Sequence, residues 1–203
     1  MNWKSILQIG LFVIIVLLIV LIYNSIQEPV RFNREVSRRE GVTIQRLKDI
    51  RTAQLAFKSE HGFFANDFDT LINFIKYGNF TIVKQIGDED ALADGLISEI
   101  IRDTVRIPIL DSIFPPNYNI DSLRYVPFAD PGSEFTIGAT ELETNSGVWV
   151  QVFEAAVENN VFLKGLDPQM LVNYNDTREK MAGFPGLRVG SLTETTNNAG
   201  NWE

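Results

Sequence analysis

The most marked pattern in the chain is an uninterrupted apolar run over residues 6–23, in which Gln8 is the only strongly polar side chain. These 18 residues would span about 27 Å as a helix, close to the thickness of the hydrocarbon core of a bilayer. Trp3 and Tyr23 lie near its two ends, where interfacial aromatic side chains belong. The pattern predicts a transmembrane helix over 6–23 after a short tail over 1–5. The side chains expected to anchor this helix are Ile6, Phe12, Ile15, Leu18 and Tyr23.

Two other interpretations of this run are weaker. A cleaved signal peptide usually has an apolar core of about 7–15 residues followed by small residues at its cleavage site, whereas here the run ends in Tyr-Asn-Ser-Ile over 23–26. A buried helix of a soluble protein usually keeps a polar face, and this run is apolar on all sides. The pattern therefore favours an uncleaved anchor.

A helical stem is predicted over 24–62. Apolar residues recur there at spacings of three and four, which places them on one face of a helix. Pro29 is expected to kink or interrupt the helix because it has no amide hydrogen, and Gly62 is expected to end it. We favour packing of the apolar face on the protein's own sheet, but its membrane-proximal part could instead pack against other subunits. The residues of this stem face are Ile44, Leu47, Ile50, Ala53 and Phe57.

The remaining chain, 63–203, alternates short apolar runs with turn sequences, which predicts an α+β head. The long amphipathic stem helix would pack on its antiparallel sheet. The acidic run at 88–90 is typical of the first turn of a helix. In chain order we expect a helix begun by Asp67 or Asp69 and ended by Gly78, a strand over 80–83, a helix over 88–102 and a strand over 104–109.

The second half of the head has the pattern of an all-β segment. Two apolar runs flank the turn sequence Ala-Asp-Pro-Gly over 129–132, which predicts a hairpin. The expected elements are strands over 123–128, 134–140 and 148–153, a turn over 158–160, a short helix capped by Asp167, and an edge strand containing Leu187 and Val189. For the tail we favour packing of Trp202 into a hydrophobic notch; the alternative is that Asn197 to Glu203 docks on a partner.

Charge divides the chain into two unlike parts. The protein has 203 residues with 18 Lys+Arg and 26 Asp+Glu, a net charge of −8. Residues 63–203 hold nine of the basic and 21 of the acidic side chains, a net charge of −12. The first 60 residues are mildly basic. The overall acidity argues against a protein dedicated to nucleic acid.

The basic side chains of the stem bear on membrane orientation. Arg31, Arg34, Arg38 and Arg39 follow the apolar run, and we expect them to form a collar that faces lipid headgroups. Counted by the positive-inside rule, they favour a cytoplasmic body. The absence of cysteine leans slightly the other way. From the residues alone, both orientations stay open.

Candidate chemistry is sparse in this sequence. With no cysteine and one histidine, a thiol nucleophile, a cysteine zinc site and a multi-histidine metal site are excluded. His61 stands at a predicted helix end, where a dipole or capping contact is the common role. Asn66, Asp67 and Asp69 fit helix capping better than a cation loop. No G-x-S-x-G, Walker A or H-E-x-x-H motif occurs, so we expect no catalytic site, metal or cofactor.

Residues 46–75, RLKDIRTAQLAFKSEHGFFANDFDTLINFI, resemble the N-terminal region of type IV pilins and type II secretion pseudopilins. That resemblance implies a hydrophobic helical spine under a small α+β head, held outside the cytoplasmic membrane. The sequence has no Gly-Phe junction after a basic leader and no acid in 1–27, so we expect neither prepilin-peptidase processing nor the usual glutamate-to-amine assembly contact. The residues that carry the resemblance are Arg51, Ala53, Ala56, Phe57, Gly62, Phe64, Asp69 and Leu71.

The C-terminal half resembles a second group, bacterial membrane-anchored proteins without an assigned activity. The similar segments are 153–167 and the end of the chain from Phe184, FPGLRVGSLTETTNNAGNWE. This resemblance implies a membrane-anchored protein but no particular activity.

Together these patterns predict a non-enzymatic, single-pass protein of the bacterial inner membrane, with its body in the periplasm as the pilin resemblance implies. It would be a pilin-like or pseudopilin-like component of a secretion or filament complex. Its partners would be the lipid bilayer and other envelope proteins or copies of itself. The alternative is a membrane-tethered periplasmic binding or sensor module that recognises a ligand or partner through its β-rich half. An enzyme that uses carboxylates is disfavoured because no motif supports it.

Overall fold

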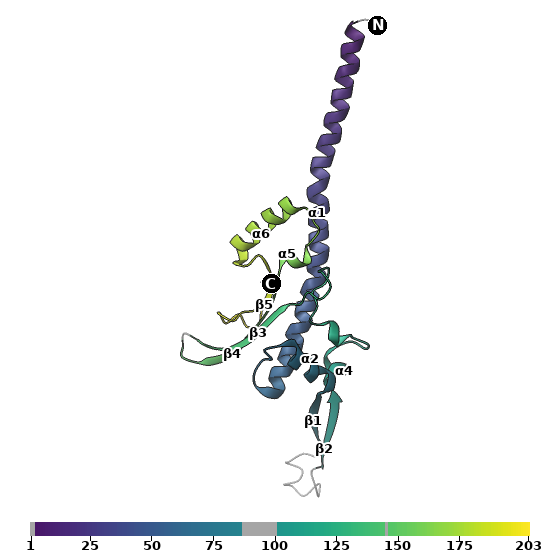
Figure 1. The fold of residues 1–203 in the computed structure, drawn as a ribbon. Coiled ribbons are helices and arrows are strands. Elements are labelled where there is room, and N and C mark those ends of the chain that lie inside the picture. Colours follow the sequence, from purple (N-terminus) through teal and green to yellow (C-terminus); the bar gives the residue numbers. More distant parts are fainter. Residues whose placement is uncertain (1–2, 87–100, 145) are drawn as a thin grey trace.

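A single long helix organises the molecule, with the other elements around its second half (Figure 1). The computed structural model describes residues 3–86, 101–144 and 146–203. Helix α1 (Trp3–His61) has 59 residues, a length of about 88 Å at 1.5 Å per residue. The N-terminus stands at the free end of α1, far from the head. The architecture is therefore mixed helix and sheet, compatible with the predicted α+β class.

The first part of α1 is exposed along its whole circumference. Large apolar side chains from Leu7 to Tyr23 are between 44% and 68% exposed. The helix is long and apolar enough there to cross a membrane. Of the two effects predicted for Pro29, a kink or an interruption, the interruption is wrong, because α1 continues through this residue. Because Pro29 has no amide hydrogen, the helix lacks one backbone hydrogen bond, to the carbonyl of Ser25. The backbone hydrogen bonds of the helical turns before and after Pro29 keep the helix continuous.

The first small unit of the head follows the end of α1. Asp67 caps α2 (Phe68–Tyr77) by accepting a 2.7 Å hydrogen bond from the Thr70 amide, and Gly78 ends it, both as predicted. Strands β1 (Asn79–Ile86) and β2 (Ile101–Pro108) then pair antiparallel. Both predicted strands are confirmed. The helix predicted over 88–102 lies outside the described residues except for its last two, which belong to β2.

The second sheet has three antiparallel strands in the order β3-β4-β5. They are β3 (Thr136–Glu143), β4 (Trp149–Glu158) and β5 (Gly186–Gly190). Strand β3 pairs with β4 from Trp149 to Ala156, whereas β5 pairs only with Glu154–Glu158. The predicted edge strand is therefore confirmed, and it covers half of β4.

The hairpin predicted over 123–140 is wrong in its first strand. Only an isolated bridge joins Tyr125 to Glu134, and β3 takes β4 as its partner instead. Leu123 and Val126 are both buried, and this three-residue spacing conflicts with the two-residue alternation of a strand. Apolar contacts with the core therefore outweigh the strand pattern.

The second half of the head contains more helix than its predicted all-β pattern allowed. Asp167 caps the most prominent helix, accepting a 2.8 Å hydrogen bond from the Met170 amide. This helix was predicted to be short, but it has 15 residues. The helical segments after β2 are α4 (Ile109–Ile113), the 3-10 turn η1 (Ile120–Ser122), α5 (Asn159–Phe162) and α6 (Pro168–Ala182).

The stem and the head share one hydrophobic core. Buried side chains of α1, from Phe32 to Phe57, belong to the same cluster as those of α2 and the three-stranded sheet. The second half of α1 is thus a structural part of the head. Fully buried members include Leu47, Ile50, Leu71, Ile75, Phe153, Leu187 and Val189.

Candidate functional site

The apolar first half of α1 is the first candidate surface. Phe12, Ile15, Leu18 and Tyr23 are 68%, 46%, 49% and 61% exposed. Ile6 lies in the same helix, but its side chain is outside the described part. Successive residues of a helix are about 100° apart, so these side chains surround α1. A surface of this kind is covered in a stable protein, either by lipid or by other apolar helices.

Three of the four arginines of the predicted collar, Arg31, Arg34 and Arg38, are exposed. Arg38 and Arg39 bind the carboxylate of Glu35 at 2.7 and 2.8 Å. These hydrogen bonds to the two guanidinium groups lower the pKa of Glu35 to about 2. Arg39 is therefore the member of the collar that is largely withdrawn from solvent, with 16% of its side chain exposed.

Arg39 also ties the membrane-proximal stem to the head. Its guanidinium donates to the carbonyl oxygens of Phe162 and Lys164 at 3.1 and 3.0 Å. The next residue, Glu40, accepts a 2.6 Å hydrogen bond from the Tyr174 hydroxyl of α6. Sequence reasoning missed these roles of Glu35 and Glu40. The signal available for Glu35 was its spacing of four residues from Arg39, which favours an ion pair on a helix.

The predicted stem face lies inside the protein's own core. Leu47, Ile50 and Ala53 are fully buried, and Phe57 is 3% exposed. Ile44 is partly buried and packs against the same cluster. This face contacts α2 and β5.

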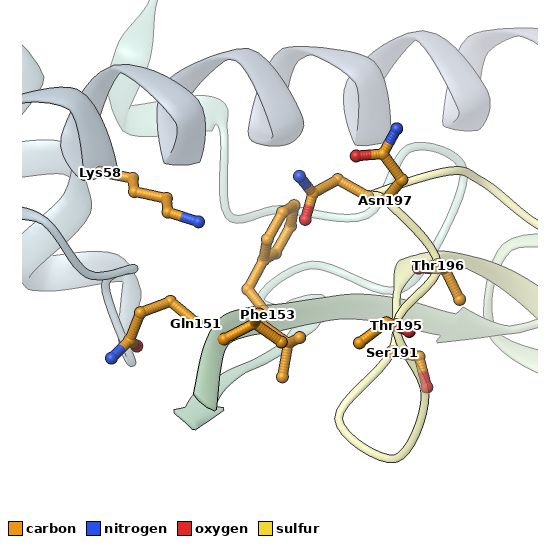
Figure 2. A pocket seen from close by; sticks show the side chains of 10 residues that line it. Lys58, Gln151, Phe153, Ser191, Thr195, Thr196 and Asn197 are labelled. Carbon is orange, nitrogen blue, oxygen red and sulfur yellow. The ribbon is translucent and has the colours of Figure 1, made fainter. Parts of the chain in front are cut away.

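The second candidate surface is a cavity of about 410 Å³ beside strand β4, which we call the β4 cleft. Figure 2 shows how three distant segments form it. Lys58 comes from α1, residues 150–153 from β4, and Ser191 with residues 195–198 from the C-terminal segment. Because these segments are far apart in sequence, no local motif could have revealed the cleft.

A change of backbone direction after β5 opens the β4 cleft. Gly190 has a φ of +74°, a conformation that side chains disfavour. A Cβ on this glycine would collide with the carbonyl oxygen of Phe153. Beyond it, the buried Ser191 hydroxyl accepts hydrogen bonds from the amides of Thr193 and Glu194, both at 3.2 Å. The chain therefore turns away from β4 and forms the far wall of the cleft.

The chemistry of the β4 cleft is that of a binding surface. The Lys58 ammonium lies 4.5 Å from the centre of the Phe64 ring and forms no ion pair within the described part of the chain. Of the described residues that line the cleft, none is acidic. Amide and hydroxyl groups, together with exposed backbone, make up most of the remaining polar lining. This arrangement favours a ligand with a negative charge and several hydrogen-bonding groups.

The C-terminal tail is folded against the sheet. Trp202 packs on the core and covers Gly200. The Asn201 side chain bonds to the carbonyl of Gly186 at 2.9 Å, and Glu203 pairs with Arg51 at 2.7 Å. Asn197 is exposed and lines the β4 cleft. The two predicted tail residues therefore have different surroundings.

The histidine and asparagine that were considered as catalytic or metal-binding candidates instead make contacts that stabilise the fold. The His61 ring stacks on Phe57, with centroids 4.2 Å apart, at the end of α1. Asn66 accepts a 3.0 Å hydrogen bond from the amide of Ala139 in β3. Within the described ranges, no cluster of three or more histidine, cysteine or acidic residues could hold a metal ion.

Comparison of the chain with protein-family models, with curated proteins and with solved structures found no match in any of the three. The resemblance to pilins and pseudopilins therefore stays a prediction.

Proposed function

We propose that this protein is a single-pass membrane protein of the bacterial envelope that acts as a pilin-like structural or assembly component. Its apolar helix would lie in the inner membrane and its head in the periplasm. Copies of the chain, or other envelope proteins, would associate with it through the first half of α1. The observation that carries the proposal is the continuity of α1 from an exposed apolar segment into the core of the head.

Physical reasons favour assembly through this helix. Lipid chains are as apolar as the side chains of α1, so close packing rather than the hydrophobic effect drives association of helices in a bilayer. A continuous helix would hold each head at a fixed height relative to that contact. We also propose a non-enzymatic role, supported by a β4 cleft that brings together one lysine with amides and hydroxyls.

Disulfide crosslinking within the membrane tests this proposal directly. The chain has no cysteine, so a single cysteine can be placed at each position from 9 to 20 in turn. After oxidation in native membranes, we expect crosslinks between copies, or to an identified envelope protein, that peak every three to four positions. Helix packing presents one face to the partner, which produces that period.

The control is Met181→Cys on α6, a position that is 80% exposed and lies outside the proposed contact. Its crosslinking yield should stay well below the yields of the peak positions. Uniformly low yields from 9 to 20 would contradict assembly through α1.

The β4 cleft favours a second candidate function, a membrane-tethered binding module. The cleft is built from the β-rich half and α1, and its cationic, hydrogen-bonding lining suits recognition of a ligand or partner. This function and assembly through α1 use different surfaces, so one does not require the other.

A further inference from the structure

Strand β4 has an edge without a neighbouring strand. Strand β5 pairs with Glu154–Glu158 and leaves Trp149–Phe153 unpaired on that side. Val152 and Phe153 are buried, so the accessible part of this edge is Trp149–Gln151, about 10 Å at 3.4 Å per residue. Such an edge presents backbone amides and carbonyls that can pair with another extended chain.

The protein's own C-terminal segment is held away from this edge. The tail returns along the other side of β5, where Val189 pairs with Gly200 and the Asn201 amide donates to the carbonyl of Arg188 at 3.0 Å. The amide of Gly190 donates to the carbonyl of Ala199, also at 3.0 Å. These bonds close residues 191–199 into a loop, so this segment cannot extend β5 along β4.

The β4 cleft lies along the open edge. Four of the five edge residues, 150–153, line it, and residues 195–198 form the facing wall (Figure 2). Lys58 projects from α1 toward the same space and, among the lining residues that the structure describes, supplies the one charged group. The cleft therefore combines strand-pairing groups with a positive charge.

Exposed apolar side chains extend the surface past the cleft. Trp149 begins the open edge and is 62% exposed, and the preceding Val148 is 56% exposed. Tryptophan is among the residues that contribute most to binding at protein interfaces. An occupant of the edge would cover both side chains.

We propose that an extended peptide segment of a partner protein adds to this edge as a fourth strand. It would continue the line of β5, antiparallel to β4, and place an acidic side chain or terminal carboxylate beside Lys58. Strand addition of this kind takes affinity from backbone hydrogen bonds and specificity from side-chain contacts. A second copy paired through the same edge would bring two Lys58 side chains to one interface without an acidic lining residue, so charge favours a different, acidic partner.

This inference deepens the second candidate function and does not depend on association through α1. The test uses the full chain in detergent micelles and a phage library that displays random octapeptides. We expect selection of peptides that alternate β-branched residues and contain an acidic group. Synthetic versions should bind the full chain and lose at least about tenfold in affinity to Lys58→Glu, because like charges are placed together.

Three controls separate strand addition from other modes of binding. Lys180→Glu, an exposed position on α6, should leave peptide affinity unchanged. Thr195→Trp, which fills the cleft from an exposed position of its far wall, should abolish binding without relying on charge. Methylation of alternate backbone nitrogens in the peptide should also abolish binding, since it removes the donors that pair with β4.

The proposal fails if the library yields no peptide that binds, or if the selected peptides bind Lys58→Glu and Thr195→Trp as tightly as the original chain. Circular dichroism of both variants establishes that they are folded. The crosslinks within α1 should be the same in Lys58→Glu. A failure of strand addition is therefore distinguishable from a failure of assembly through the membrane helix.

Discussion

Gln54 shows how one buried polar residue fixes the end of the stem. It is fully buried on α1, and its amide makes two hydrogen bonds to the backbone of Ala65. The Gln54 nitrogen donates to the Ala65 carbonyl at 2.7 Å, and the Ala65 amide donates to the Gln54 oxygen at 2.9 Å. The loop after α1 is thereby clamped back onto the helix with its backbone groups satisfied.

Replacing Gln54 with leucine should therefore destabilise the protein although the new side chain is apolar and similar in size. The change leaves the amide and the carbonyl of Ala65 buried without partners, at a cost of about 2–4 kcal/mol. Urea unfolding of the full chain in micelles measures this loss. Gln45→Leu, on an exposed part of the same helix, should change the free energy of unfolding by less than about 0.5 kcal/mol; equal effects would contradict the role of the clamp.

The two halves of helix α1 differ in how their apolar side chains are arranged around the helix. Its first half is apolar all round, whereas its second half buries one face, including Leu47 and Ile50, and leaves Leu55 44% exposed. The register of the helix in the core follows from this one-sided burial. The loss of stability caused by a substitution on this half of α1 should therefore depend more on whether the side chain faces the core than on the type of residue.

Two leucines on α1 provide a matched pair for that expectation. Leu47→Ala should lower the free energy of unfolding by about 2–5 kcal/mol, because it leaves a cavity in the core. Leu55→Ala should cost less than about 1 kcal/mol, since much of this side chain is in solvent. Urea denaturation of the two variants, monitored by circular dichroism, compares them; equal losses would show that α1 packs in a different register.

The sequence predicted correctly those helix ends and caps that depend on residues close to them in the chain. Asp167 was recognised as a cap, Asp67 as one of two candidate caps, and Gly62 and Gly78 as helix ends, because these residues act within a few positions of themselves. Segment 123–128 was mispredicted because its side chains are buried by contacts with distant parts of the head. The length of α6 was underestimated because none of its side chains is buried, so the segment lacks the apolar stripe that marks a core helix.

Of the candidate surfaces, only those on α1 were predictable. The apolar segment is a continuous run and the stem face is a periodic pattern within one helix, so the sequence displays both. The β4 cleft requires Lys58, β4 and the C-terminal loop to meet. Nothing within any one of these segments indicates the other two, and the open edge of β4 depends on where Gly190 turns the chain.

At the scale of the whole molecule, charge and apolar surface are separated along α1. A mildly basic stem lies between the apolar segment and a head region with a net charge of −12 over residues 63–203. Anionic headgroups would attract the exposed Arg31 and Arg34 and repel the acidic head. The charge distribution therefore favours a head that points away from the bilayer, on whichever side of the membrane it lies.

The proposed orientation can be measured with a membrane-impermeant maleimide on spheroplasts. Met181→Cys should be labelled in intact spheroplasts, because its site on the head would be periplasmic. Lys4→Cys, on the other side of the apolar segment, should be labelled only after lysis. The reverse pattern would place the head in the cytoplasm and would agree with the positive-inside count of the stem arginines.

The unbroken run of α1 from the apolar segment into the core makes the helix a lever. From Tyr23 to His61 it extends about 57 Å, with the head fixed along much of that length. Transmembrane helices tilt by about 20° on average, and tilt responds to bilayer thickness. A tilt of that size would carry the far end of α1 sideways by about 20 Å. A local change in membrane thickness that altered this tilt would thus move the head sideways. Its surfaces would then approach a neighbouring molecule or move away from it.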